Sequence, residues 1–532
     1  MRPPQQLPCG VVRESLQRAA AGRLAAPLGI AAGAVLLRVI SGVGFANYDT
    51  LYALAWGGQL SRGSSPAYGL PVAPTPHPLV EALGVILSPL SPRTIENVTV
   101  WLGFIALSAC GWVVYRLGAE WFGRAVGALA ALILLTRVPI ISYGVRAYVD
   151  VPYLLLVLSA VLLESTRRRA GAPVLVLLAL AGLLRPEAWV FSGLYWLYLL
   201  LSQDVSAYAG ARRGPGAGGI SASSLFLSER SHRTHSHARG RAGARASLFG
   251  VTLLAFCAPA IWVLSDLAIA HDALWSLTNT RHTAETLHRV TGIRHVPEYI
   301  PKRIGEVLGA PVLAAAVLGG VASLLWLREQ AMMPALVGVV AVLVFAAFAS
   351  AGLPINTRYA FLASAILMIF AGAGVLGWMS LEAGDPRRVP WMAMGALLAV
   401  AILAYAPSQY RTVHRELSSG PHNLAHQEGI QNELLALVAD HQINLRCGRV
   451  GVSNHAPVPL LALYLKTSPA NIVDGERDRP ISRGVYVDPA SREVEDDYVL
   501  DRNDPHIPVS VPAGFTAAGG NRSWRIYRRC EG

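Results

Sequence analysis

Apolar residues in this chain occur in long continuous blocks, without the spacing of an amphipathic helix or of a half-buried strand. Val251–Ala270 and Phe361–Met379 are two such blocks, and both carry almost no charge. A helix needs about 20 residues to cross the ~30 Å hydrocarbon core of a bilayer, so each block predicts a membrane span. We predict eleven spans, at about 27–46, 96–115, 125–143, 149–165, 172–184, 187–201, 248–270, 307–327, 332–350, 358–379 and 390–405.

Three of the apolar stretches are shorter than a straight span. Those at 172–184 and 187–201 meet at Arg185–Pro186–Glu187, which predicts two short helices hinged at the proline, one rising and one returning. Residues 79–90 are bounded by prolines. They predict an interfacial or re-entrant helix inside the long loop 47–94.

Clusters of arginine set the predicted orientation of the chain. They fall at 2–23, 167–169, 202–247 and 387–388. Loops rich in Lys and Arg stay in the cytoplasm, so we predict a cytoplasmic N-terminus and an outer location for the polar loop 271–306. The segment 202–247 is also rich in Gly and Ser, and it predicts a flexible basic linker.

The chain becomes polar after about residue 406. Ile430–Asp440 has a helical pattern, and apolar runs such as Arg449–Ser453 and Leu460–Leu465 are separated by turn residues. This pattern predicts a small α/β domain on the outer face. Its two cysteines, Cys447 and Cys530, can pair if the domain faces an oxidising compartment.

We therefore predict a multi-pass protein of the plasma membrane in three parts. A cytoplasmic segment covers residues 1–26, a transmembrane domain covers 27–405, and an extracytoplasmic domain covers 406–532.

Composition supports the same class. The 532 residues are 53% hydrophobic and only 15% charged, against roughly 25% charged in an ordinary soluble protein. These values exclude a soluble globular enzyme, a disordered chain and a coiled coil. The net charge of +12 lies in short loops and one linker and is accompanied by no nucleic-acid motif, so we expect no nucleic-acid partner.

Ionisable side chains gather at the outer ends of the predicted spans. Such groups at a membrane boundary are costly, and they are functional candidates for that reason. Arginine binds phosphate in a forked geometry, and a carboxylate can deprotonate a hydroxyl or hold a metal. The candidates on this face are Asp49, His77, Arg146, Asp150, Arg185, Glu187, Arg358 and Tyr359.

The acidic candidates and the histidine each have a structural alternative. Asp49 can cap the helix predicted at Leu51–Leu60, and Asp150 can cap the span that it opens. His77 lies between two prolines and can serve only to shape a turn.

The remaining candidates also have structural alternatives. Arg185 and Glu187 can form a salt bridge that marks the hinge. Arg358 can anchor a span at the interface, and Tyr359 can belong to an aromatic belt.

Several of these residues lie in motifs that resemble the GT-C superfamily of membrane glycosyltransferases. Residues 47–68, NYDTLYALAWGGQLSRGSSPAY, resemble its first outer loop, and TPHPL at 75–79 resembles its histidine–proline turn. AYVDVPYLLL at 147–156 and INTRYAFL at 355–362 are similar to two of its span entries. The pattern is most similar to the protein O-mannosyltransferase and aminoarabinose transferase branch (family 39-like) and to actinobacterial membrane mannosyl- and arabinosyltransferases.

The resemblance implies a fold and an activity. The fold is an all-α polytopic GT-C-like membrane protein, here with about 11 transmembrane helices and the small C-terminal α/β domain. The activity is transfer of a sugar, a hexose or a pentose, from a polyprenyl-phosphate donor. The acceptor is a hydroxyl on the outer face, carried by a glycan, lipid or protein of the cell envelope.

The resemblance also implies residue roles. Asp49 is the expected general base, with Asp150 assisting. Arg185 and Arg358 are expected to hold the lipid phosphate. His77, Arg146, Glu187 and Tyr359 are the expected substrate-binding residues.

The motifs depart from the superfamily in two places. Where relatives carry a paired Asp-Glu motif, this chain has Asp49–Thr50, which leaves the need for a divalent metal open. TPHPL has one proline after the histidine where many relatives have two.

Two other classes of protein compete with this interpretation. Short helices broken at a proline also occur in transporters, so a transporter or lipid flippase is one alternative. A catalytically inactive GT-C-like scaffold is the other, because the second acidic residue is missing.

Overall fold

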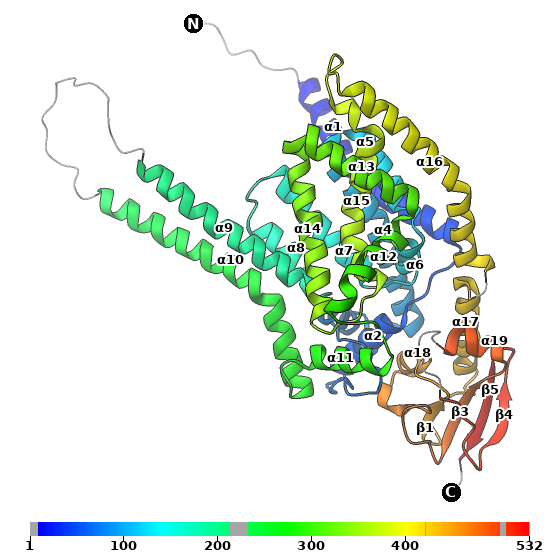
Figure 1. Ribbon diagram of the computed structural model, residues 1–532. Coiled ribbons are helices and arrows are strands. Elements are labelled where there is room, and N and C mark those ends of the chain that lie inside the picture. The colour runs from blue at the N-terminus through cyan, green and yellow to red at the C-terminus, as the bar shows by residue number, and fades with distance from the viewer. Residues whose placement is uncertain (1–8, 213–231, 421, 501–506, 531–532) are drawn as a thin grey trace, which may run out of the picture.

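A computed structural model of the chain describes residues 9–212, 232–420, 422–500 and 507–530 (Figure 1). We call the helices from α1 to α16 the helical body, and residues 415–530 the C-terminal unit. The helices of the helical body are α1 (Cys9–Ser41), α2 (Tyr48–Ser61), α3 (Pro78–Leu87), α4 (Pro92–Phe122), α5 (Arg124–Leu134), α6 (Val138–Val145), α7 (Asp150–Thr166), α8 (Ala172–Gly182), α9 (Glu187–Arg212), α10 (His232–Ala270), α11 (Trp275–Thr286), α12 (Val296–Leu308), α13 (Ala310–Trp326), α14 (Arg328–Ser350), α15 (Phe361–Leu376) and α16 (Arg388–His414).

Helix length and composition support a membrane protein. Among the described residues, six helices are long and apolar enough to span a bilayer, and eight if each of two bent pairs counts as one span. α7 has 17 residues and α8 has 11, so both are shorter than a straight crossing requires. The count of eleven spans and the sidedness of the two ends therefore stay predictions.

The candidate spans differ sharply in burial. The span Thr357–Ser380 contains α15, and 89% of its 18-residue apolar stretch is buried. In the α1 span Leu24–Ser41, only 11% of the corresponding stretch is buried. α1 and α16 instead expose large apolar side chains, such as Val39 and Leu397. Because such surface is costly in water, these outer helices are suited to contact with lipid, with α15 at the centre.

Helix boundaries depart from the predicted ranges in several places. The span predicted at 125–143 is broken into α5 and α6, which are bent by 66° relative to each other, and α16 continues to His414, past the predicted end at 405. α1 ends at Ser41 and not near residue 46, because Gly42 adopts φ +66° and terminates the helix in the left-handed conformation. The polar region 271–306, predicted as a loop, folds largely into α11 and α12.

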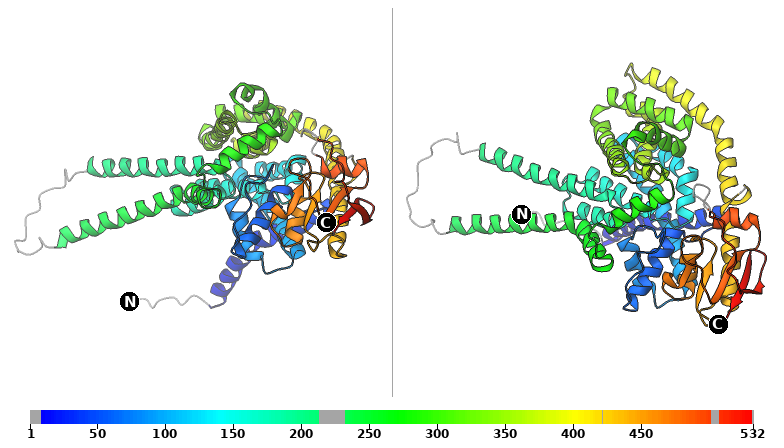
Figure 2. Two further views of the ribbon diagram at one scale, coloured as in Figure 1. Left: turned by 90° about the horizontal axis from the view of Figure 1, so that it is seen from below. Right: turned by 60° about the horizontal axis from the view of Figure 1, so that its bottom comes forward.

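The break at Arg185–Pro186–Glu187 is confirmed, since α8 ends at Gly182 and α9 begins at Glu187. Beyond it, part of the predicted linker 202–247 is helical, because α9 runs to Arg212 and α10 begins at His232. The two helices extend side by side away from the rest of the helical body (Figures 1 and 2). The remainder of that linker, residues 213–231, lies outside the described residues.

The C-terminal unit is an α/β structure, as predicted. Its mixed sheet has the order β2-β1-β3-β5-β4, with β2, β1 and β3 parallel and β5 antiparallel to both β3 and β4. The strands are β1 (Arg449–Val452), β2 (Ile472–Asp474), β3 (Gly484–Pro489), β4 (Thr516–Gly520) and β5 (Trp524–Arg529). The helices are α17 (Leu424–Ala439), α18 (Val458–Tyr464) and α19 (Arg492–Val494), followed directly by the π-turn η6 (Glu495–Val499).

The structure shows where the apolar run and the two cysteines of this unit lie. The apolar run Leu460–Leu465 lies mainly in the buried helix α18. Cys447 and Cys530 form a disulfide, which joins the residues just before β1 and just after β5. The disulfide therefore links β1 and β5, the two strands that flank the central strand β3, at one end of the sheet.

The C-terminal unit packs against the end of the helical body that carries α2 and α11 (Figure 1). The Gln59 side chain in α2 donates a hydrogen bond of 3.1 Å to Ser468 Oγ. Glu96 at the start of α4 accepts a hydrogen bond from the hydroxyl of Tyr464 in α18. These contacts hold the C-terminal unit against the last turn of α2 and the start of α4.

α2 and α3 approach each other closely through glycines. A Cβ added at Gly84 would lie 2.9 Å from the Leu54 carbonyl oxygen, and one added at Gly57 would collide with the carbonyl oxygen of Glu81. The backbones of the two helices therefore lie in direct contact at these glycines.

Replacing Gly57 by alanine should weaken this packing, because the added methyl group has no room against α3. Overpacking of this kind costs about 1–3 kcal/mol, so we expect a lower unfolding temperature for the purified protein in detergent. Gly58→Ala is the matched control, since a Cβ there meets only the flexible Arg62 side chain, at 3.4 Å. Equal destabilisation of the two variants would contradict the packing argument.

Candidate functional site

The N-terminus of α2 is held by Asn47, which is the residue that caps the helix. Asn47 Oδ1 accepts hydrogen bonds from the backbone N–H groups of Asp49, at 2.9 Å, and Thr50, at 3.2 Å. The Asn47 amide donates to the Arg146 carbonyl oxygen at 3.0 Å, and the Thr50 hydroxyl donates to the Ala147 carbonyl oxygen at 2.9 Å. The cap therefore does not need the Asp49 side chain, which is left available for another contact.

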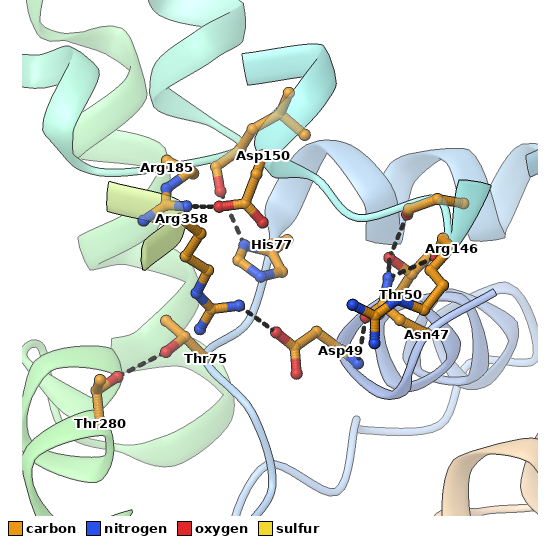
Figure 3. Close-up of polar contacts among 12 residues, drawn as sticks. Asn47, Asp49, Thr50, Thr75, His77, Arg146, Asp150, Arg185, Thr280 and Arg358 are labelled. Atoms are coloured by element: carbon orange, nitrogen blue, oxygen red, sulfur yellow. Dashed lines mark hydrogen bonds and ion pairs between the residues drawn. The ribbon is translucent and has the colours of Figure 1, made fainter. Parts of the chain in front are cut away.

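That contact is an ion pair with Arg358. Arg358 Nη1 lies 2.9 Å from Asp49 Oδ2, and the two side chains are 23% and 18% exposed (Figure 3). Arg358 belongs to the short 3-10 turn η2 (Thr357–Ala360) that leads into α15. Its Nε is buried and has no hydrogen-bond partner. The guanidinium thus keeps an unused donor while it holds Asp49.

A second charged group is buried behind this pair. Arg185 forms an ion pair with Asp150, and its Nη2 lies 2.6 Å from Glu187 Oε1. The Arg185 guanidinium also lies over the ring of Tyr359, 4.4 Å from the centroid. Each of the three charged side chains is less than 10% exposed. Both carboxylates are therefore engaged with one arginine, and the predicted salt bridge at the hinge is present.

His77 lies at the start of α3, in the TPHPL turn, and is buried. Its Nδ1 lies 2.8 Å from the Leu184 carbonyl oxygen, which can only accept, so Nδ1 carries the proton and Nε2 is the unprotonated nitrogen. Burial disfavours the charged imidazolium and lowers the pKa of His77 from 6.5 to about 4, with Asp49 opposing the shift and Arg358 and Arg185 adding to it. The ring is therefore neutral at physiological pH.

Arg146 differs from the other two arginines in its contacts. It donates to Ser142 through its Nε, at 3.1 Å to the carbonyl oxygen, and through Nη2, at 2.9 Å to the hydroxyl. Its guanidinium lies over the rings of Tyr148 and Tyr143, at 5.0 and 5.5 Å. Within the described part of the chain, no carboxylate lies within ion-pair distance of Arg146.

These side chains surround one cavity of about 1150 Å³. Seven of the eight residues singled out from the sequence line it, and Asp150 is the exception because it lies behind Arg185. The seven are Asp49, His77, Arg146, Arg185, Glu187, Arg358 and Tyr359. The cavity thus brings together residues from four separate motifs (Figure 3).

The cavity also has a wall in which the sequence analysis singled out no residues. The C-terminal unit contributes His422, Gln427, His455 and Asp497, among others. No local signal identified them, since the C-terminal unit was predicted as a separate domain without a candidate site. Tyr143 and Tyr148 also line the cavity, and their positions on either side of Arg146 were the available clue.

A metal ion bound by Asp49 does not fit these contacts. The Asp49 carboxylate faces a cation, Arg358, at 2.9 Å. Among the described residues, the group of three metal-ligating side chains close enough to share an ion is His426, Glu493 and Asp497, in the C-terminal unit.

Comparison with known proteins identifies a structural relative. No protein-family model matches the chain, and no curated protein matches it. Among solved structures, the chain is similar to ArnT from Cupriavidus metallidurans, crystallised with undecaprenyl phosphate bound. The TM-score is 0.52 and the sequence identity 13%, over 94% of this chain and 97% of that one. The likeness covers the C-terminal unit as well as the helical body, and it shows that the two chains share a fold.

Asp150→Asn should destabilise the protein more than Asp49→Asn. Removing one partner of a buried ion pair costs roughly 3–5 kcal/mol, and Asp150 is 1% exposed whereas the Asp49 side chain is 18% exposed. Thermal unfolding of both purified variants in detergent tests this order. A larger loss for Asp49→Asn would show that Asp150 does not maintain the Arg185 cluster.

His77 should make stability sensitive to mild acid. Unfolded histidine takes up a proton below a pKa of 6.5, but folded His77 does so only near 4. The unfolded state therefore binds more protons between these values, and stability falls as pH falls through this window. The measurement is the unfolding free energy of wild type minus that of His77→Gln, in which the amide can still donate to the Leu184 carbonyl oxygen. We expect a constant difference above pH 6.5 and a decline towards pH 4; a difference independent of pH would contradict the assignment.

Proposed function

We propose that this protein is a membrane glycosyltransferase that moves a sugar from a polyprenyl-phosphate donor to a hydroxyl acceptor. The observation that carries the proposal is the Asp49–Arg358 pair on the wall of the large cavity. It sets a carboxylate that can accept a proton beside a guanidinium that can bind phosphate. The ArnT structure, which contains undecaprenyl phosphate, supports a lipid phosphate as the carrier.

In this reaction Asp49 is the general base. One of its carboxylate oxygens takes the proton of the acceptor hydroxyl as that oxygen bonds to the anomeric carbon of the sugar. The bond between the anomeric carbon and the phosphate oxygen breaks at the same centre. The electron pair leaves with the polyprenyl phosphate, so negative charge grows on the leaving group and remains as a phosphate monoester.

The arginines of the cavity stabilise that leaving group. Arg358 has the buried Nε donor without a partner, and Arg146 has no carboxylate within ion-pair distance in the described part of the chain. Arg185 is already engaged by Asp150 and Glu187. We therefore assign phosphate binding chiefly to Arg358 and Arg146, with Arg185 as a weaker contributor.

The other predicted residues have supporting roles in the proposal. Asp150 is a positioning residue, because it does not line the cavity and acts only through Arg185. Neutral His77 has the unprotonated Nε2, which can accept a hydrogen bond from a sugar hydroxyl. Glu187 and Tyr359 hold the Arg185 side chain at the cavity wall.

The proposed topology has the cavity on the outer side of the plasma membrane. The helical body, from about 27 to 405, would span the membrane, with residues 1–26 in the cytoplasm and 406–532 outside. The disulfide between Cys447 and Cys530 supports an oxidising compartment for the C-terminal unit. The acceptor would then be a glycan, lipid or protein of the cell envelope, and the donor sugar a hexose or pentose of the mannosyl, arabinosyl or aminoarabinosyl type.

Transfer of labelled sugar tests the proposal directly. Membranes containing wild type, Asp49→Asn or Asp440→Asn are incubated with a set of radiolabelled polyprenyl-phosphate sugars. Loss of a general base typically costs about 10²- to 10⁴-fold in rate, so we expect that drop for Asp49→Asn at unchanged protein level. Asp440→Asn should match wild type, because Asp440 is an exposed residue after α17.

The other outcomes separate the competing functions. Full transfer by Asp49→Asn would remove Asp49 as the base. If folded wild type transfers no sugar from any donor, the glycosyltransferase proposal fails. Transport of the lipid across vesicles would then indicate a flippase, and its absence an inactive scaffold.

A further inference from the structure

A second cluster of ionisable side chains lies on the wall that the C-terminal unit adds to the cavity. His422 and His426 come from the turn before α17 and from its first turn, and Glu493 and Asp497 come from α19 and η6. His422 and Asp497 also line the cavity. None of the four has a role in the proposed transfer reaction.

Asp497 contacts both histidines of this cluster, and Glu493 lies beside His426. His422 Nδ1 and Asp497 Oδ1 form an ion pair, and His426 Nε2 lies 3.2 Å from the other oxygen of the same carboxylate. His426 Nε2 is also 4.0 Å from Glu493 Oε1. The ligand atoms of His426, Glu493 and Asp497 all lie within 4.8 Å of one another. Bonds to zinc are about 2.0–2.2 Å long, so small side-chain rotations would bring these atoms to the spacing of a shared ion.

The spacing along the chain also suits a metal. His422 and His426 are four residues apart, an H-x₃-H spacing that is common in zinc sites. Asn423, between them, caps α17 and accepts a hydrogen bond of 2.9 Å from the backbone N–H of His426. The cap therefore fixes the backbone between the two histidines.

A network of hydrogen bonds alone does not account for the position of His426. Its Nε2 is buried and has no hydrogen-bond partner, although Asp497 Oδ2 is only 3.2 Å away. The Asp497 carboxylate therefore faces Nε2 without a well-aligned hydrogen bond between them. A neutral imidazole in this position can offer its Nε2 lone pair to a cation that the same carboxylate also binds.

We propose that His422, His426, Glu493 and Asp497 bind one divalent cation of the zinc class. Two imidazoles and two carboxylates are a ligand set that suits Zn²⁺, and the two negative charges balance the ion. The ion would link the start of α17 to η6 and so fix the wall of the C-terminal unit against the cavity. This inference does not depend on the proposed function, because it gives none of the four side chains a part in the transfer reaction.

Metal content of the full-length protein tests the site. Purified wild type in detergent is stripped with a chelator, loaded with Zn²⁺ and freed of excess ion, and the bound zinc is counted by elemental mass spectrometry. We expect one tightly bound Zn²⁺ per chain. Loading with Co²⁺ instead should produce the visible absorption bands of a tetrahedral nitrogen and oxygen site.

Variants locate the bound ion. Loss of second-shell groups alone lowers metal affinity by about 10- to 100-fold, so the double variant His422→Gln/His426→Gln should lose at least about 100-fold. Asp497→Asn should weaken binding as a single change and serves as the check if the double variant does not fold. His282→Gln is the matched control, because His282 is an exposed histidine on α11, outside the cavity lining.

Two results would overturn the proposal. One is wild-type protein that keeps no zinc above the level of a metal-free blank. The other is zinc bound equally by wild type, the double variant and Asp497→Asn, which would place the ion elsewhere. In either case the four side chains form only a local ion-pair network.

Discussion

The ion pair between Asp49 and Arg358 is the contact on which the arrangement of the cavity depends. It joins the first turn of α2 to the turn that opens α15, 309 residues later in the chain. A charge with little access to water is costly without a partner, so neither side chain can take this position alone. α15 lies in the most buried of the candidate spans, in which 89% of the 18-residue apolar stretch is buried. The pair thus attaches the start of α2 to the buried centre of the helical body.

The same constraint explains why the charges of the cavity are layered. Asp150, Arg185 and Glu187 satisfy one another in the deeper layer, where exposure is lowest. Asp49 and Arg358 form a shallower layer that remains partly exposed to the cavity. In the proposed reaction the deep layer holds the framework in place, and only the shallow layer exchanges partners with the substrate. A phosphate that binds Arg358 would share the guanidinium with Asp49 and would not have to break the buried cluster.

The cavity is a joint product of the helical body and the C-terminal unit. Hydrogen bonds such as that from Gln59 to Ser468 hold the unit against α2, and the disulfide between Cys447 and Cys530 links the strands β1 and β5 at one end of its sheet. The proposed zinc site would act at the same boundary, by tying α17 to η6. The C-terminal unit is therefore part of the cavity wall, and not an independent module attached to a complete membrane enzyme.

The sequence by itself determined the features that depend on local chemistry. Block length and low charge identified the apolar helices, Pro186 identified the break between α8 and α9, and turn residues identified an α/β unit after about residue 406. The position of ionisable side chains near the predicted span ends identified seven residues that line the cavity. All of these signals can be evaluated within one short segment of the chain.

Only the tertiary structure decided which of these residues meet. Asp150 pairs with Arg185 and lies outside the cavity lining, whereas Asp49 meets Arg358 because Asn47 takes over the helix cap. The region 271–306 folds into helices, and the C-terminal unit supplies one cavity wall. Contacts between residues hundreds of positions apart depend on how helices pack and on where buried charges find partners. Hydropathy and spacing along one segment contain no information about either.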